Sequence, residues 1–278
     1  MKAVVTAGGE GTRLYPSSRA FPKELFHFQG KPVIEYGIDL LRDAGINDIF
    51  VVTGRKKGAL QDYFGSGETF GVNIAYITQE EPKGLGDAVL CTKPYIKDSK
   101  DDSFVLLLGD TIFKGSNDLE EMLKIHSKEK STSTILVEKV QEPERYGVVK
   151  FESVADNCGK IKDLYEKPEA KDVKDNFCFD GGWFSIAGLY VFNKKIFDFL
   201  ENISPGANNE LQLTDAVKES LKDSASYGFV MKGKRIDVGT WDYMEAEREE
   251  YINTSLEELR EIISGKKALM EKMKSNKR

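Results

Sequence analysis

Apolar runs alternate with amphipathic segments over residues 1–130 of the chain. The runs are short and rich in aliphatic residues, which is typical of buried strands, and they lie at residues 3–5, 48–53, 72–78 and 103–108. Apolar residues at helical spacing predict helices at residues 31–45, 58–64, 88–95 and 119–129. This alternation predicts a mostly parallel sheet with helices on both of its faces.

The pattern changes after residue 131, where short strands separated by turn residues follow one another. We expect these strands at residues 133–140, 147–151, 161–166, 186–192 and 229–236. Helices are predicted at residues 194–201 and 211–221, the second with Thr214 as a cap near its start. No internal repeat or linker rich in proline, glycine or serine separates the two halves. The second half is therefore expected to continue the same sheet.

The segment from residue 241 onward is charged and has a helical pattern. Its apolar positions recur at near-helical spacing and are Leu256, Leu259, Ile262 and Ile263. A helix with one apolar face is therefore predicted, which either packs back onto its own sheet or helps to form a homo-oligomer. Both interpretations stay open. Residues 270–278 are too polar and basic to bury, so we expect them to fray.

Composition excludes several classes of protein. The chain has 278 residues, of which 40% are hydrophobic and 31% charged, and a net charge of −6. That balance is typical of a soluble globular protein and argues against nucleic acid as a main partner. No apolar run reaches the ~18 residues of a membrane span, and we expect no signal peptide because the N-terminus enters a strand at once. The three cysteines lack metal-binding spacing and are interpreted as reduced thiols of a cytoplasmic protein.

A glycine-rich turn follows the first predicted strand. Gly8, Gly9 and Gly11 let the backbone turn sharply and approach a ligand closely, and successive N–H groups in such a turn bind anions. Arg13 and Lys23 add two cations suited to phosphate oxygens. The spacing matches neither a Walker A loop nor the dinucleotide-binding fingerprint. A strand, a glycine turn and two cations together predict a polyphosphate site.

Other polar residues fall at the carboxyl ends of predicted strands, where ligands gather in such sheets. Gln79 offers a donor and an acceptor, which suits the edge of a uracil or thymine ring, and Gly84 would let the backbone add a second hydrogen bond. The alternative interpretation of this segment is a surface loop capped by Asp87. Asp110 is placed to hold Mg²⁺, which usually takes one or two carboxylates, with a simple turn residue as the alternative.

Two further features are weighed in the same way. Glu166 and Lys167 follow a predicted strand, and they are interpreted either as ligand contacts or as solvated charges of a strand-ending turn. The histidines, His27 and His126, lack partners at catalytic spacing. Neither is therefore expected to act as a general base.

Longer sequence motifs identify a protein family more specifically than single residues do. The sequence GGEGTRLYP at residues 8–16, followed by PKE at 22–24 and KPVI at 31–34, resembles the signature of the sugar-1-phosphate nucleotidyltransferases. The resemblance extends over residues 1–245, and the nearest members are the glucose-1-phosphate uridylyltransferases and thymidylyltransferases. It implies a Rossmann-like α/β fold with a mixed, mostly parallel sheet and C-terminal helices. It also implies a reaction that joins a nucleoside triphosphate to a sugar phosphate and releases pyrophosphate. The implied cofactor is Mg²⁺.

The resemblance assigns roles to individual residues. The catalytic residues that it implies are Arg13, Lys23, Asp110, Lys167 and Asp237. The implied nucleotide-binding residues are Ala7, Gly8, Gly9, Gly11, Thr12, Arg13, Lys23, Gln79, Gly84 and Asp110. Gly147, Glu166 and Lys167 are implied to bind the sugar phosphate, and Asp110 and Asp237 to bind the metal. The family-typical segment at residues 209–216 is assigned a structural role.

The expected substrates are UTP and glucose-1-phosphate or a related hexose-1-phosphate. Departures from the usual family pattern, such as HFQ at residues 27–29, leave dTTP open as the alternative nucleotide. Two other functions are weighed. The incomplete dinucleotide-binding fingerprint argues against an oxidoreductase. The presence of all five charged residues that the resemblance implies as catalytic argues against a non-catalytic binder of sugar nucleotides. A homo-oligomer is expected.

We expect one nucleotidyltransferase domain over residues 1–245. Its nucleotide-binding half would span residues 1–130 and its sugar-binding half residues 131–245. A helical tail would follow over residues 246–278.

Overall fold

The computed structural model describes residues 1–55, 58–169, 173, 178–179, 182–206, 209–253, 260, 264–265 and 267. The strands of its first half are β1 (Lys2–Ala7), β2 (His27–Phe28), β3 (Lys31–Pro32), β4 (Asp48–Gly54), β5 (Asn73–Gln79), β6 (Ser103–Leu108) and β7 (Thr111–Lys114). Those of its second half are β8 (Ser133–Val140), β9 (Gly147–Ala155), β10 (Cys158–Glu166), β11 (Cys178–Phe179), β12 (Gly182–Asn193), β13 (Ser226–Val230) and β14 (Lys234–Asp237).

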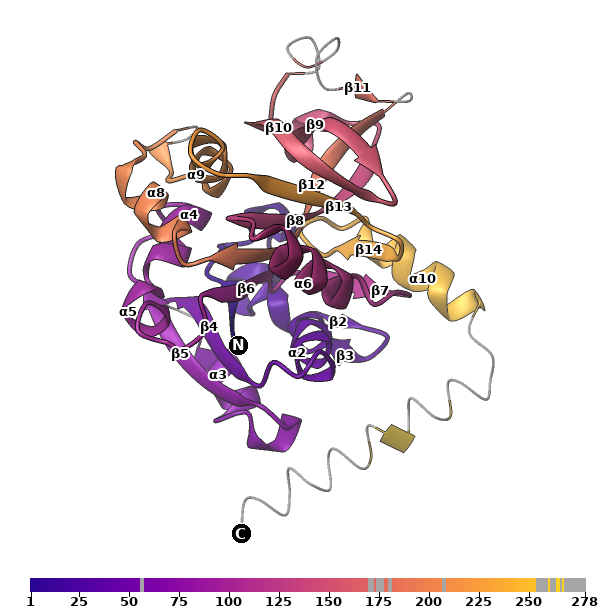
Figure 1. The fold of residues 1–278 in the computed structure, drawn as a ribbon. Coiled ribbons are helices and arrows are strands. Elements are labelled where there is room, and N and C mark those ends of the chain that lie inside the picture. The colour runs from indigo at the N-terminus through magenta and orange to yellow at the C-terminus, as the bar shows by residue number, and fades with distance from the viewer. Residues whose placement is uncertain are drawn as a thin grey trace.

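One mixed sheet of ten strands runs through the described part of the chain (Figure 1). Its order is β5-β4-β1-β6-β12-β8-β13-β10-β9, with β11 beside β12. The first four strands in this order are parallel, as the alternating pattern of residues 1–130 predicts. The mixed α/β fold expected from the sequence is confirmed, but the sheet is mostly parallel only in its first half, because most strands of the second half pair antiparallel.

Strand β12 joins the two halves of the sheet. It pairs antiparallel with β6 on one side and with β8 on the other. Beyond β8, the pairing is parallel with β13 and antiparallel from there to β10 and β9. The second half therefore extends the first sheet at the edge formed by β6. Two small sheets, β7 with β14 and β2 with β3, lie outside it.

Helices cover both faces of the sheet because neighbouring residues of its strands point in opposite directions. The helices are α1 (Ser17–Ala20), α2 (Val33–Asp43), α3 (Gly58–Phe64), α4 (Leu85–Leu90), α5 (Lys93–Ile96), α6 (Asp118–Glu129), α8 (Ile196–Asn202), α9 (Leu213–Ser220) and α10 (Tyr243–Asn253). Val5 and Leu107 face a core formed with α2, α3 and α6. Val4 and Leu106 face a second core formed with α4, α5, α8 and α9.

Two of the predicted elements are each divided into two in the structure. The helix predicted at residues 88–95 is divided into α4 and α5, because Pro94 lies at the start of α5 and cannot continue a helix from the preceding turn. The strand predicted at residues 229–236 is divided into β13 and β14. The chain bends at Gly233, where a Cβ atom would lie only 2.2 Å from the carbonyl oxygen of Lys114. Only glycine permits this close approach, so β14 leaves the main sheet and pairs with β7.

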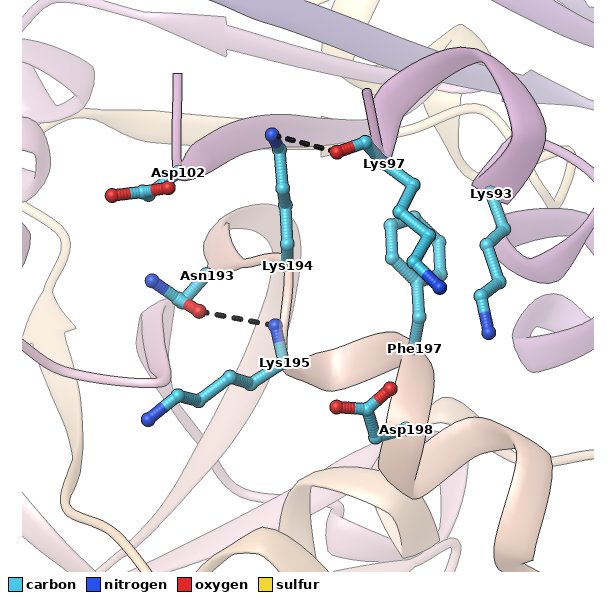
Figure 2. A pocket seen from close by; sticks show the side chains of 8 residues that line it. All are labelled: Lys93, Lys97, Asp102, Asn193, Lys194, Lys195, Phe197 and Asp198. Carbon is cyan, nitrogen blue, oxygen red and sulfur yellow. Dashed lines mark hydrogen bonds between the residues drawn. The ribbon is translucent and has the colours of Figure 1, made fainter. Parts of the chain in front are cut away.

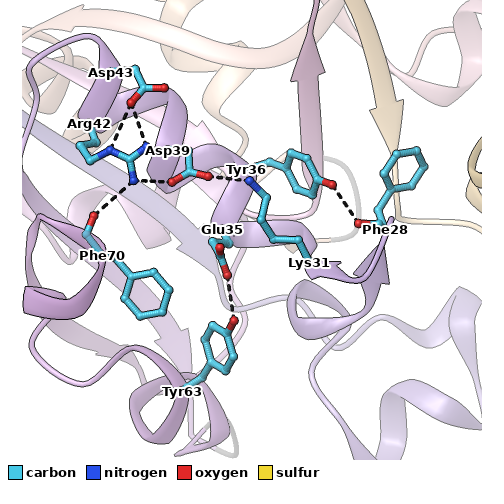
Figure 3. Close-up of polar contacts among 9 residues, drawn as sticks. All are labelled: Phe28, Lys31, Glu35, Tyr36, Asp39, Arg42, Asp43, Tyr63 and Phe70. Atoms are coloured by element: carbon cyan, nitrogen blue, oxygen red, sulfur yellow. Dashed lines mark hydrogen bonds and ion pairs between the residues drawn. The ribbon is translucent and has the colours of Figure 1, made fainter. Parts of the chain in front are cut away.

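Helix α2 is tied to its neighbours by a set of polar contacts (Figure 3). Tyr63 of α3 points toward Glu35 of α2, and its hydroxyl donates to Oε2 of Glu35 at 2.8 Å. Burial raises the pKa of Glu35, although the bond from Tyr63 opposes the rise. On the same helix, Asp39 pairs with Lys31 and Arg42, each at 2.5 Å. These contacts tie α2 to α3 and to β3.

The C-terminal helix α10 ends the main described part of the chain (Figure 1). The apolar positions predicted at Leu256, Leu259, Ile262 and Ile263 lie outside the described residues, as does the segment 270–278. Among the helices of the described residues, none has the length and apolar character needed to cross a membrane.

Candidate active site

The glycine-rich loop begins where β1 ends and leads into a short 3-10 helix at Thr12–Leu14. Gly11 has a φ of +65°, and the hydroxyl of Ser18 donates to its carbonyl oxygen at 2.6 Å. The side chain of Lys23 lies along this loop: a Cβ on Gly11 would be 3.3 Å from its Cδ, and one on Gly9 would be 3.8 Å from its Nζ. The predicted phosphate loop and its lysine are therefore adjacent.

Lys23 forms an ion pair with Asp110, which lies just beyond the end of β6. Burial alone would lower the pKa of Lys23, but the carboxylates of Asp110, Glu24 and Asp237 outweigh it and leave the pKa raised. The ammonium group is therefore held in its charged form by acidic neighbours.

Asp237 is brought to the same place from the far end of the sequence. It pairs with Thr111 in the register of β14 with β7, and the N–H of Val238 donates to the carbonyl oxygen of Asp110 at 2.9 Å. Its own Oδ1 accepts from the N–H of Gly239 at 2.7 Å. Arg13 is close by, because a Cβ on Gly239 would lie 3.4 Å from its guanidinium. The predicted residues Arg13, Lys23, Asp110 and Asp237 thus form one cluster.

This cluster fits a divalent metal that takes few protein ligands. Asp110, just before β7, and Asp237, on the paired strand β14, supply hard carboxylate oxygens, and the Lys23 ammonium already lies on Asp110. Within the described residues, no set of three or more His, Cys, Asp or Glu side chains is arranged to enclose a metal. Two carboxylates, completed by phosphate oxygens and water, are the arrangement typical of Mg²⁺.

Gln79 lies at the end of β5 and is 6% exposed. Its Nε2 donates to the carbonyl oxygen of Gly84 at 3.1 Å and to Oδ2 of Asp87 at 2.7 Å. Its Oε1 lies 2.9 Å from where a Cβ on Gly8 would be. Gln79 is therefore next to the glycine-rich loop. The interpretation of Asp87 as a cap is wrong, because it lies inside α4 and its carboxylate accepts from Gln79.

The loop that carries Gly84 is bonded to the segment before α9. Gly84 has a φ of +104°, and a Cβ there would lie 2.7 Å from the carbonyl oxygen of Leu211. The N–H of Leu211 donates to the carbonyl oxygen of Lys83 at 2.7 Å, and its carbonyl oxygen accepts from the N–H of Gly86 at 2.8 Å. Leu211 therefore holds the loop on both sides of Gly84.

The predicted sugar-side residues form a second cluster. Glu166 and Gly147 are partners in the register of β10 with β9. The hydroxyl of Thr214 donates to Oε2 of Glu166 at 2.6 Å. Lys167 is half-exposed, and its ammonium lies 3.4 Å from Oε1 of Glu166. The backbone N–H of Lys167 donates to the carbonyl oxygen of Tyr146 at 3.1 Å.

Arg235 connects the two clusters. It is two residues before Asp237 on β14, forms an ion pair with Glu138 of β8, and lies over the ring of Tyr146, 4.6 Å from its centre. Burial raises the pKa of Glu138 against the opposing effect of Arg235. Strand β14, which carries Asp237, is thereby attached to Tyr146, the residue that precedes Gly147.

Sequence reasoning missed several of these residues. Thr214 was expected to cap α9, but its hydroxyl instead binds Glu166, and the cap position is occupied by Gln212. Its signal was the family-typical segment around it, which was assigned a structural role. Arg235 shares a strand face with Asp237, because side chains two residues apart point the same way. That spacing is the signal that could have found it.

A separate hollow of about 400 Å³ lies at the opposite end of β6 from Asp110 (Figure 2). Its lining residues are Lys93, Lys97, Asp102, Asn193, Lys194, Lys195, Phe197 and Asp198. Lys194 points to the backbone just after α5 and donates to the carbonyl oxygens of Lys97 and Ser99, and Lys93 pairs with Glu201. Two of its four lysines thus bond within the fold, and it contains none of the predicted site residues.

Known proteins resemble this chain over most of its length. The model of the nucleotidyl transferase family matches residues 2–253. A UTP–glucose-1-phosphate uridylyltransferase of Bacillus subtilis is 34% identical, over 92% of this chain and 90% of its own. A UDP-glucose pyrophosphorylase solved with UDP-glucose has a TM-score of 0.80 at 30% identity, covering 91% of this chain and 99% of its own.

A Bacillus anthracis structure described as a glucose-1-phosphate thymidylyltransferase has a TM-score of 0.76 at 27% identity, covering 92% of this chain and 97% of its own. These matches confirm the family and the fold that the sequence motifs predict. The chain belongs to the nucleotidyl transferase family and is a nucleotidyltransferase enzyme.

Proposed function

We propose that the protein transfers the uridylyl group of UTP to glucose-1-phosphate, giving UDP-glucose and pyrophosphate. The observation that carries this proposal is the convergence of Arg13, Lys23, Asp110 and Asp237 beside the glycine-rich loop. Cations next to a loop of free N–H groups suit a triphosphate, and adjacent carboxylates suit its metal. The names of the related uridylyltransferases support the choice of UTP and glucose-1-phosphate.

The chemistry is an in-line attack by the sugar phosphate on the α-phosphorus of the nucleotide. The attacking phosphate has a second pKa near ~6, so it is ionised at neutral pH and needs no general base. This agrees with the surroundings of His126, which is buried among hydroxyl groups away from the cluster. Catalysis is then positioning and charge neutralisation.

Each predicted residue has a role in this scheme. Arg13 would hold the β- and γ-phosphates, and Lys23 would meet the α-phosphate and the charge that develops on it. The loop residues Ala7, Gly8, Gly9, Gly11 and Thr12 would cradle the phosphates. When bound by Asp110 and Asp237, Mg²⁺ would neutralise charge on the reacting phosphates.

The sugar side would be held by the second cluster. Lys167 would hold the phosphate of glucose-1-phosphate, Glu166 would accept hydrogen bonds from ring hydroxyls, and the backbone of Gly147 would contact the sugar. The arrangement supports this because Thr214 and Lys167 both bond to Glu166 and fix its carboxylate. Gln79 and Gly84 would hold the pyrimidine ring next to the phosphate loop.

The deciding experiment measures pyrophosphate release from the purified protein with UTP, glucose-1-phosphate and Mg²⁺. We expect steady turnover that stops when the metal is chelated and returns when Mg²⁺ is added. The same assay with dTTP tests the alternative nucleotide, and other hexose-1-phosphates test the sugar. Absence of pyrophosphate release with every nucleotide and sugar phosphate would contradict the proposed reaction.

We also propose a cytoplasmic homo-oligomer with one domain over residues 1–245 and a tail over residues 246–278. The free thiols of Cys91 and Cys158 support the compartment, because thiols stay reduced in the cytoplasm. Truncation after Asn253 removes the predicted apolar stripe and no proposed catalytic residue. If the tail forms the interface, the shortened chain will fold but have a smaller mass in solution. An unchanged oligomeric state excludes the tail as the interface.

A further inference from the structure

The amide group of Gln79 is held in one orientation by two acceptors. Its Nε2 carries two N–H donors, and these go to the carbonyl oxygen of Gly84 and to the carboxylate of Asp87. A carbonyl oxygen and an ionised carboxylate accept hydrogen bonds and donate none. Rotation of the amide by half a turn would bring its own oxygen against both of them. The nitrogen must therefore face Asp87.

The oxygen of the same amide consequently faces the other way. Oε1 lies toward Gly8, the first residue of the phosphate loop, and the 6% exposure of Gln79 leaves the group little contact with solvent. Both of its donors are already used, so Gln79 offers a ligand an acceptor only. Gly84 and Asp87, which accept hydrogen bonds from Nε2, therefore determine that the amide presents its oxygen to a ligand.

We infer that Asp87 is a specificity-determining positioning residue, which fixes the Gln79 amide so that its oxygen reads the N3–H group of a uracil or thymine ring. This inference rests on the proposed function, in which Gln79 lies against the base. Cytosine has an unprotonated N3 that is itself an acceptor. It would meet the Gln79 oxygen with no hydrogen between them, so the site rejects CTP.

The contribution of Asp87 differs from that of Gly84. The Asp87 bond is shorter, 2.7 Å against 3.1 Å, and it is made to a charged acceptor. Hydrogen bonds to charged groups contribute roughly twice as much as neutral ones. Asp87 is thus the stronger of the two groups that set the orientation. It touches Gln79 and has no assigned contact with the substrate.

The test compares kcat/KM for UTP and CTP, with glucose-1-phosphate saturating, in three variants. Asp87→Leu removes the acceptor at similar size and is expected to reduce the UTP-over-CTP ratio by at least ~10-fold, the effect of losing one charge-assisted hydrogen bond. Asp87→Asn keeps an oxygen that accepts from Nε2, so it is expected to retain most of the ratio. Asp87→Lys presents only donors, attracts the Gln79 oxygen, and is expected to give the lowest ratio.

The matched control is Asp98→Leu, an exposed aspartate between α5 and β6, which is expected to leave the ratio unchanged. If Asp87→Leu does not fold, Asp87→Ala takes its place in the series. A fully folded, active Asp87→Leu or Asp87→Ala enzyme with the wild-type ratio would overturn the inference. Failure of the proposed function looks different, because the wild-type protein would then release no pyrophosphate with UTP.

Discussion

The guanidinium of Arg235 pairs with the carboxylate of Glu138, and both side chains are mostly buried, at 8% and 18% exposure. The pair joins β14, which carries Asp237, to β8 in the main sheet. The small sheet of β7 and β14 is not part of the main sheet, so this contact helps to fix its position relative to the sugar-side residues.

Arg235→Ala is expected to destabilise the protein by about 3 kcal/mol, because it leaves the Glu138 carboxylate buried without its partner. Urea unfolding measures this change. The double variant Arg235→Met with Glu138→Leu should regain more than half of the loss, since replacing both charges by apolar groups removes the buried charge as well. A single variant as stable as wild type would show that the pair is not important for the fold.

Lys23→Ala and Asp110→Ala are each expected to reduce kcat by at least ~100-fold, which is typical of losing one electrostatic stabiliser of the transition state. Steady-state pyrophosphate release measures the effect, and circular dichroism checks the fold. Lys124→Ala is the matched control, because this exposed lysine pairs with Glu121 of its own helix, away from the site. Near-normal turnover in either site variant would contradict the proposed roles.

Thr214→Val is expected to raise the KM for glucose-1-phosphate about 10-fold, because Glu166 loses a hydrogen bond worth roughly 1.5–3 kcal/mol to a charged group. The KM for UTP should hardly change, since Thr214 bonds to the sugar-side cluster. Thr214→Ser keeps the hydroxyl and should restore the wild-type value. Equal KM values for the Val and Ser variants would mean that the Thr214 hydroxyl does not position Glu166.

Protonation of His126 is expected to destabilise the protein in mild acid. Burial lowers the pKa of His126 to about 4, while the unfolded chain has a histidine pKa near ~6.5. The unfolded state therefore binds more protons between these values. The stabilisation is complete above pH ~6.5 and is lost as the pH falls toward 4, up to about 3 kcal/mol.

Urea unfolding at pH 7, 6 and 5 measures this dependence. In His126→Gln the group that titrates is absent, so its stability relative to wild type should rise steadily as the pH falls. Other titrating groups are common to both proteins and cancel in the difference. A difference that is constant across this range would contradict the assignment to His126.

The sequence predicts best where function depends on short, local strings. The glycine-rich turn, Gln79 and Asp110 each follow an apolar strand, and the carboxyl ends of parallel strands meet at one edge of a sheet, so the strings alone indicate that these residues lie together. The division of α4 from α5 was also open to prediction, because Pro94 is visible in the sequence. The position of each of these residues can be predicted from the few residues on either side of it in the sequence.

The residues that were missed depend on contacts between distant segments. Thr214 reaches Glu166 only because α9 packs on β10, 48 residues earlier in the chain. Asp87 appears as a helix cap in the sequence, and its bond to Gln79 depends on how the intervening loop folds back. The bend at Gly233 requires the carbonyl of Lys114 to be in place. No local pattern encodes such pairings.

The backbone bonds of Leu211 have a thermodynamic consequence. This residue is tied to Lys83 and Gly86 of the base-side loop and precedes Thr214 of the sugar-side cluster by three positions. On the proposed assignment, a nucleotide that orders the loop would also order the segment that leads to Thr214, and it would lower the entropy cost of binding the sugar phosphate. Linkage then requires reciprocity: the factor by which nucleotide tightens sugar-phosphate binding equals the factor by which sugar phosphate tightens nucleotide binding.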